Sequence, residues 1–313
     1  MEGRGLQSEG PIEGPIEVWR GSVNAWECDE MGHMNVRFHL ARAMQGLATA
    51  AAALGMHNAF SPSAPATLAV REHHVRYLRE ARVGAPLHMT AGVLDIDESE
   101  ATLLLSLIHS PTGEAASTFV TRVAHISATE GRRFPWPGRA VEAARRLQTA
   151  LTAESGPRSI TAAAPGGDEV EAAGYEVIAR GAVAPEDCDV FGRMRPEMLP
   201  ARLSEGLTHL TVPLREAARR EVGPAVRVGG AALEMRLSYF DLPRSGALVE
   251  LRSAIVEVKP KSARFRHWLV DPLTGAAWAA GEQVSINFDL DARKAIALSE
   301  ESVERLKPFV RGL

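Results

Sequence analysis

The segment from Trp26 to Val36, WECDEMGHMNV, gathers acidic, thiol, imidazole and amide groups around one glycine. A carboxylate such as Asp29 can attack a carbonyl carbon directly or activate a water molecule that does so. A predicted helix follows, and amides at a helix N-terminus carry partial positive charge, so the amides from Met34 to Val36 can stabilise a developing oxyanion. The candidate residues are Asp29, His33 and Asn35 for catalysis and Gly32 and Met34 for substrate binding.

Each of these residues also has a purely structural interpretation. Most aspartates that precede a helix close a turn or cap the helix, and Asp29 can do either. His33 and Asn35 can orient the carboxylate, bind a substrate carbonyl, or serve only as polar turn residues. Cys28 has no predictable histidine and asparagine partners, so we expect a small buried residue there rather than a nucleophile.

A close relative of this segment, EDCDVFGRMRP, occurs at residues 186–196. At a constant offset of 160, eleven of the 29 positions in residues 19–47 are identical to those in residues 179–207, without a gap. Cys28 and Cys188 occupy equivalent places, which favours duplication over a disulfide between them. The chain is therefore one unit written twice, and each copy should form one supersecondary module.

The second copy keeps the carboxylate but changes its neighbours. Asp189 is a second candidate catalytic residue, whereas two arginines, Arg193 and Arg195, replace the histidine and the asparagine. Two hypotheses follow for this copy. It is either a degenerate half that completes the first site, or its arginines contact substrate by binding phosphate groups, which suit the planar guanidinium fork.

Hydrophobic periodicity identifies the helices that position these side chains. Apolar residues recur at spacings of four and three from Leu40 to Leu54, which predicts a helix. Alanine fills most of its other faces, so we expect this helix to be wrapped by other structure. The second copy repeats the stripe from Leu199 to Leu214, where Pro200 and Pro213 obscure both ends of the helix.

Period-two apolar runs separated by short turn-forming clusters follow each helix and predict an antiparallel meander. The runs lie at residues 87–96, 101–110 and 115–127 in the first copy and at residues 248–258, 263–270 and 276–288 in the second. A long helix followed by a meander, twice, predicts an α+β fold in which a curved sheet covers a helix.

The length of 313 residues suits two domains of about 150 residues each. We divide the chain into a first domain, residues 1–132, a linker, residues 133–174, and a second domain, residues 175–313. Residues 1–15 are expected to be a loose tail. The linker is rich in proline, glycine and alanine and contains a predicted helix, residues 140–154.

Composition excludes several classes of partner. A net charge of -4 provides no basic stripe for a nucleic acid backbone. The most apolar stretch, GLATAAAALGM, is shorter than the roughly 18 residues of a membrane span, and the N-terminus lacks the cationic and apolar regions of a signal peptide. These features predict a cytoplasmic protein without a membrane partner.

The sequence shows no spacing of residues that predicts a metal site. His73 and His74 are adjacent on a predicted strand and point to opposite faces, so they cannot hold a metal together, and no other metal-binding spacing occurs.

Two motifs in the first copy, ECDEMGHMN and VRYLREARVG, resemble those of hot-dog fold thioesterases of the 4-hydroxybenzoyl-CoA thioesterase-like branch. That family has an acid-x-Asp-x-x-Gly-His-x-Asn loop before its central helix and a later strand that ends in Tyr-Leu-Arg and then glycine. The resemblance covers the first copy and, more weakly, the second. It implies a double hot dog that hydrolyses acyl-CoA, with Asp29 and Asp189 as the catalytic carboxylates and no cofactor.

The resemblance also implies how the copies assemble. They should pack as a pseudo-dimer with one side-by-side sheet, so that the Asp29 loop faces the second copy. Hot-dog pairs commonly assemble further, which is compatible with a homo-oligomer. Glu72, in the strand before the Tyr-Leu-Arg motif, can face the substrate channel or lie on an exposed sheet face. The candidates for binding CoA phosphates, or for a solvated surface, are Arg79, Arg82, Arg132 and Arg133.

Two other functions remain open from the sequence alone. A hot-dog enoyl-CoA hydratase is one, but its Asp and His signature with an intervening Asn-Pro is absent. A non-catalytic acyl-CoA-binding module, in which the loop only grips its ligand, is the other.

Overall fold

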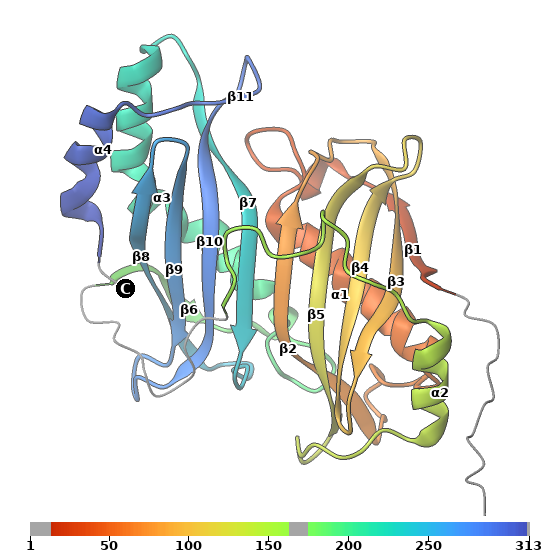
Figure 1. The fold of residues 1–313 in the computed structure, drawn as a ribbon. Coiled ribbons are helices and arrows are strands. Elements are labelled where there is room, and N and C mark those ends of the chain that lie inside the picture. Colours follow the sequence, from red (N-terminus) through yellow and green to blue (C-terminus); the bar gives the residue numbers. More distant parts are fainter. Residues whose placement is uncertain (1–13, 163–174, 312–313) are drawn as a thin grey trace, which may run out of the picture.

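A computed structural model describes residues 14–162 and 175–311 of the chain. Two similar halves lie side by side, each with a long helix behind an antiparallel sheet (Figure 1). The predicted loose tail lies outside the described residues except for its last two, and so does the end of the linker, residues 163–174. No described helix has the length and apolarity needed to cross a membrane.

The element order repeats between the halves, as the sequence predicts. The first half consists of β1 (Ile16–Ser22), α1 (Val36–Ala53), β2 (Ala66–Tyr77), β3 (Pro86–Ile96), β4 (Glu100–His109) and β5 (Ala115–Ser127). The second consists of β6 (Glu176–Ala182), α3 (Met198–Val222), β7 (Val228–Tyr239), β8 (Leu248–Lys259), β9 (Ser262–Val270), β10 (Ala277–Asp289) and the short β11 (Lys294–Ala295). Helix α2 (Gly138–Arg146) lies in the linker, and α4 (Glu300–Leu306) near the C-terminus.

The two meanders join into a single sheet. Strands follow the order β1-β3-β4-β5-β2-β7-β10-β9-β8-β6, and β2 pairs antiparallel with β7 at the centre. Val75 of β2 lies opposite Met235 of β7, and both side chains are fully buried. The prediction of one continuous sheet across a pseudo-dimer is therefore confirmed.

Helix α1 packs against the concave side of this sheet through its apolar stripe. Leu40 and Leu47 are fully buried. Gly46 allows the close approach, because a Cβ atom there would lie 2.7 Å from the Sδ of Met89 on β3. Helix α3 is longer and continues through Pro213 to Val222, which the sequence left open.

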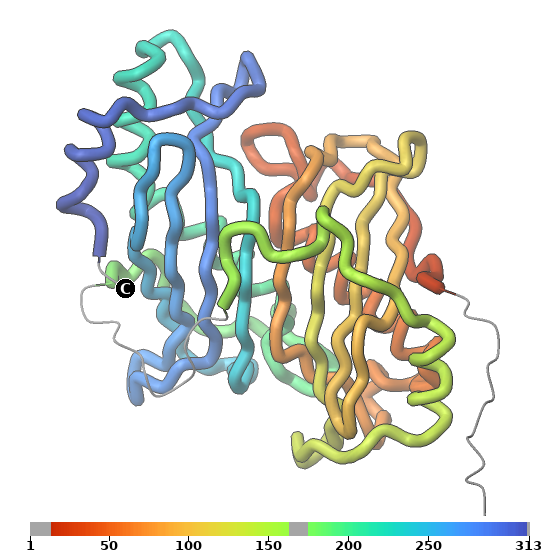
Figure 2. The backbone as a smooth tube through the Cα atoms, in the orientation of Figure 1, coloured from red at the N-terminus to blue at the C-terminus, as the bar shows by residue number. Residues whose placement is uncertain are grey.

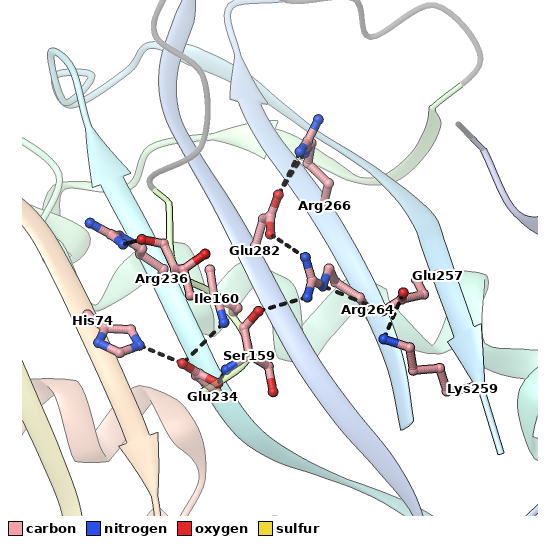
Figure 3. Close-up of polar contacts among 11 residues, drawn as sticks. His74, Ser159, Ile160, Glu234, Arg236, Glu257, Lys259, Arg264, Arg266 and Glu282 are labelled. Atoms are coloured by element: carbon pink, nitrogen blue, oxygen red, sulfur yellow. Dashed lines mark hydrogen bonds and ion pairs between the residues drawn. The ribbon is translucent and has the colours of Figure 1, made fainter. Parts of the chain in front are cut away.

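The linker crosses the opposite face of the sheet, over the β2–β7 junction (Figure 2). There the buried carboxylate of Glu234 accepts hydrogen bonds from the amides of Arg158 (2.9 Å) and Ser159 (2.7 Å), and lies 2.8 Å from His74 Nε2 (Figure 3). Burial raises the pKa of Glu234, but these hydrogen bonds outweigh burial and lower it to about 2. This carboxylate therefore ties the linker to both halves of the sheet.

Candidate functional site

Two cavities lie between the halves, and each combines the loop of one half with the helix of the other. The larger, of about 740 Å³, is lined by the Asp29 loop and by α3, β7 and β10. The smaller, of about 390 Å³, is lined by the Asp189 loop and by α1 and the start of β2. The expectation that the Asp29 loop faces the second copy is therefore confirmed.

In the larger cavity, Asp29 is held by its own loop. Its Oδ1 accepts a hydrogen bond from the Met31 amide at 2.9 Å, and its Oδ2 lies 3.2 Å from His33 Nδ1. Both side chains are mostly buried, 13% and 15% exposed. The hydrogen bond to Asp29 raises the pKa of His33, against the effect of burial. The structure thus joins Asp29 and His33 at the cavity wall.

Gly32 shapes the loop that carries Asp29 and His33. It adopts a φ of +79°, in the left-handed region that favours glycine, and its amide donates to the Asp29 carbonyl at 3.0 Å. The equivalent Gly192 has a φ of +74° and the same bond to Asp189. This turn brings the histidine back beside the carboxylate.

Asn35 caps helix α1. Its Oδ1 accepts from the Arg37 amide at 2.9 Å, and its Nδ2 lies 3.3 Å from the Ser204 hydroxyl of α3. Both polar ends of this side chain therefore have protein partners, one of them in the other half of the chain. The geometry gives Asn35 a structural role that fixes where the helix begins.

The predicted oxyanion site is smaller than the sequence suggested. The amide of Met34 donates to the Ala81 carbonyl at 2.7 Å, and the amide of Asn35 donates to the Glu27 carbonyl at 2.8 Å. The expectation that these two amides face a substrate is wrong, because both are used in short bridges that hold the loop. Among the described residues, the Val36 amide has no protein acceptor at the start of α1.

Sequence reasoning missed His39, which also lines the larger cavity. Its Nδ1 lies 2.9 Å from the Ser117 hydroxyl, and its ring meets the edge of Tyr77 at 5.3 Å. Burial lowers the pKa of His39 to about 4, so its imidazole is neutral near pH 7. Its spacing of four from Asn35, which places both on one helix face, was the available indication.

Arg293 was also missed, because it reaches the Asp29 site from the turn between β10 and β11. It pairs with Glu80 of the first half and stacks over Phe288 at 5.2 Å. Its φ of 54° is left-handed although it is not glycine, and such strain is retained where the surrounding contacts require it. No sequence pattern predicts this contact, since it depends on how the two halves assemble.

The smaller cavity keeps the carboxylate in a different setting. Asp189 Oδ1 accepts from the amides of Phe191 (2.8 Å) and Arg193 (3.0 Å), without an imidazole beside it. The Arg195 guanidinium donates to the Glu186 carbonyl at 2.9 Å. Pro196 occupies the place of Val36, so this half has no free amide at the equivalent position.

Glu72 does not reach either cavity, and its assignment to substrate binding is wrong. It lies on the face of β2 that the linker covers, where it forms an ion pair with Arg236 at 2.9 Å. The neighbouring His73 points to the other face and meets the Tyr239 ring at 5.8 Å. Just before this point, a β-bulge between Val70 and Glu72 changes which face of β2 the following side chains point to.

The remaining polar candidates divide between the cavity and the surface. Arg79 and Arg82 line the larger cavity and are mostly exposed, whereas Arg132 and Arg133 pair with Glu130 and Glu100 away from it.

Cys28 and Cys188 are both half-buried rather than fully buried. The pKa of each thiol is raised, chiefly by burial, which opposes a nucleophilic thiolate. The described residues contain no cluster of three metal-ligating side chains.

Comparison with known proteins places the two halves in one family. The family model described as the Thioesterase-like superfamily matches residues 23–146 and 183–306. No curated protein matches the sequence.

Solved structures match most of the chain at low identity. A protein described as an oleoyl thioesterase from Lactobacillus plantarum is 13% identical with a TM-score of 0.65, over 91% of this chain and 98% of its own. The 12:0-ACP thioesterase from Umbellularia californica is 10% identical with a TM-score of 0.65, over 86% and 92%. An acyl-ACP thioesterase from Bacteroides thetaiotaomicron is 10% identical with a TM-score of 0.59, over 85% and 96%. These similarities confirm the double hot-dog fold.

Proposed function

Because the chain belongs to the Thioesterase-like superfamily and is a thioester hydrolase, we propose that it hydrolyses an acyl-CoA in the larger cavity, with Asp29 as the reacting carboxylate. The observation that carries this proposal is the buried Asp29–His33 pair, which stands in the same cavity wall as the free Val36 amide. The products are a free acid and CoA.

Two chemical routes use the same residues. In one, an Asp29 oxygen attacks the thioester carbon, the C–S bond breaks, CoA leaves as a thiolate, and water then hydrolyses the mixed anhydride. In the other, Asp29 takes a proton from water, and the resulting hydroxide attacks the same carbon. In both, negative charge develops on the carbonyl oxygen, which the Val36 amide and the N-terminus of α1 can stabilise.

His33 supports either route by holding the carboxylate. Its raised pKa keeps it protonated over a wider pH range, so that it donates to Asp29 Oδ2 and fixes the orientation of the reacting oxygen. The neutral His39 lies deeper in the same cavity and adds no positive charge near pH 7. The two histidines therefore differ, because the pKa of His33 is raised and that of His39 is lowered.

Arginines at the same cavity support CoA as the carrier. Arg79 and Arg82 are 63% and 62% exposed, and guanidinium groups bind phosphates through paired hydrogen bonds. Two of the solved structures are described as acyl-ACP thioesterases, so acyl-ACP is the carrier to compare.

The proposal is tested by release of free thiol from short, long, branched and aryl acyl-CoAs and from matched acyl-ACPs. We expect turnover of at least one acyl-CoA, and loss of that turnover in Thr208→Trp, because Thr208 lines the larger cavity from α3 and an indole there would fill it. Thr49→Trp, an exposed position on α1 that lines neither cavity, is the matched control. Binding of acyl-CoA without release of thiol from any thioester would contradict the proposal and indicate a binding module.

A further inference from the structure

The smaller cavity has the shape of a ligand site and not of a packing defect. Its volume of about 390 Å³ lies within the range of roughly 300–1,000 Å³ that is typical of small-molecule pockets. Helix α1 contributes Met44 and Ala48 to it, where α3 contributes Ser204 and Thr208 to the larger cavity. Its apolar wall also includes Phe60, Leu68, Val70, Phe191, Phe240 and Leu242.

The same cavity keeps the carboxylate, Asp189, but lacks the other groups that the proposed hydrolysis uses. Arginines replace the histidine and the asparagine of the first copy, and Pro196 removes the amide that would face an oxyanion. Tyr239 donates its hydroxyl hydrogen bond to the Pro196 carbonyl at 3.3 Å, which orders the backbone at this point. A ligand in this cavity would be held without being cleaved.

Charged side chains of both signs gather at the polar end of the cavity. Arg71, Arg193 and Arg195 line it, opposed by Asp189 and Asp241. The Nε atoms of Arg71 and Arg195 are buried and have no hydrogen-bond partner among the described residues. Buried donors in proteins are normally paired, so an acceptor on a ligand in the cavity can complete these two groups.

Glu197 adds a second unpaired group to the same wall. The residue is 4% exposed, and its Oε2 has no partner among the described residues, while its Oε1 lies 3.3 Å from Arg195. Burial raises the pKa of this carboxyl. When it carries a proton, its hydroxyl can donate a hydrogen bond to an acceptor in the cavity.

We propose that the smaller cavity binds a free carboxylic acid with an apolar tail and holds it unchanged. The guanidinium groups match a carboxylate in charge and geometry, and a protonated Glu197 can donate to the same head group. The tail lies against Met44, Ala48 and the aromatic wall. This inference does not depend on the proposed hydrolysis, because acid binding and thiol release are separate measurements.

Isothermal titration with decanoate tests the head group. We expect binding to wild type, and an affinity about tenfold lower in Arg193→Gln/Arg195→Gln, because charge-assisted hydrogen bonds to the carboxylate are lost. Arg145→Gln, an exposed arginine on α2, is the matched control and should bind as wild type does. Decanol should show no dependence on these arginines. Equal affinity for decanoate in the double variant and in wild type would overturn the proposal.

A second pair of variants identifies the cavity. Ala48 and Thr208 are equivalent positions of the repeat, and each lines one cavity. Ala48→Trp should abolish the arginine-dependent binding of decanoate, and Thr208→Trp should leave it in place. The opposite result would place the acid in the larger cavity. Tighter, arginine-dependent binding of a non-hydrolysable decanoyl-CoA thioether would show that the site takes the CoA ester instead, and would also overturn the proposal.

The source of the acid is distinguished by comparing chain types. If hexanoate, decanoate, myristate and phenylacetate bind in the same order as their thioesters are hydrolysed, the ligand is the product of the larger cavity. A different order would indicate an acid from elsewhere. Both results support a carboxylate site.

Discussion

The two cavities descend from one duplicated module, yet three neighbouring positions separate them. His33, Asn35 and Val36 follow the carboxylate in the first loop, and arginine, arginine and proline take their places in the second. Asp29 has an imidazole and one amide as partners, whereas Asp189 has two amides. Because the carboxylate is common to both halves, the difference in function that we propose rests on its neighbours.

The helices that close the two cavities, α1 and α3, have diverged as well. Each cavity is closed by the helix of the opposite half, so the helix residues that line it belong to a different copy from the carboxylate. Ser204 and Thr208 face the Asp29 loop, and the apolar Met44 and Ala48 face the Asp189 loop. In the functions that we propose, duplication has let one site become reactive while the other became a pocket for an apolar tail.

Among exchanges of residues between the two sites, the largest predicted effect comes from making the first site resemble the second at a single position. Val36→Pro removes the free amide, and we expect turnover to fall by about a hundredfold to a thousandfold, as for other oxyanion donors. Proline is well tolerated at the first position of a helix, and Asn35 already has the extended conformation that precedes proline, so the fold should persist. Steady-state kinetics against Val36→Ala measures the effect. Unchanged turnover in the proline variant would exclude the amide from catalysis.

The converse exchange should give the second site some activity. In an Asp29→Asn background, Arg193→His/Arg195→Asn/Pro196→Val restores the first-copy residues around Asp189. We expect thiol release about tenfold above that of Asp29→Asn alone, because only part of the general-base and oxyanion contribution is recovered. The single change Arg193→His is the control. No gain in the triple variant would mean that differences beyond these three positions separate the cavities.

Glu234 lies at the β2–β7 junction, and both cavities are formed across this junction. Glu234→Gln leaves buried donors without a charged acceptor, and we expect the free energy of unfolding at neutral pH to fall by about 2 kcal/mol. Since folding lowers the pKa of Glu234 from 4.5 to about 2, its contribution is full above 4.5 and is lost as pH falls through 2. Denaturant unfolding of both proteins across this range should therefore converge at low pH. A constant difference would contradict this assignment.

The smallest effect should come from Asn35, which separates capping from catalysis. Asn35→Ala removes the cap and should cost about 1 kcal/mol of stability, whereas Asn35→Asp keeps a capping oxygen. We expect the aspartate variant to melt like wild type and to retain most of its turnover. Strong loss of turnover in a stably folded aspartate variant would show that the amide group touches the substrate.

Local sequence patterns predicted the parts of this structure that local physics determines. The stripe from Leu40 to Leu54 gave helix α1, and period-two runs gave the meanders. Strand β1 was not predicted, because only Val18 of its seven residues is buried and the alternation is weak. The contact between His33 and Asp29 was one of the alternatives that the sequence left open for this histidine.

The rest of the site depends on contacts that cross between halves or between faces of the sheet. Glu72 is buried because the linker covers its face of β2, and no pattern near Glu72 reveals that cover. Arg293 reaches the first site from the far end of the second half. The amides of Met34 and Asn35 are occupied by Ala81 and Glu27, which only the folded loop brings within reach.

The central claim is that one of two equivalent carboxylates performs the hydrolysis. Thiol release measured side by side for Asp29→Asn and Asp189→Asn tests it most directly, on the acyl-CoA that wild type hydrolyses best. We predict a loss of about a hundredfold to ten-thousandfold in kcat/KM for Asp29→Asn, and a value close to wild type for Asp189→Asn. Equal losses in the two variants, or a larger loss in Asp189→Asn, would contradict the account.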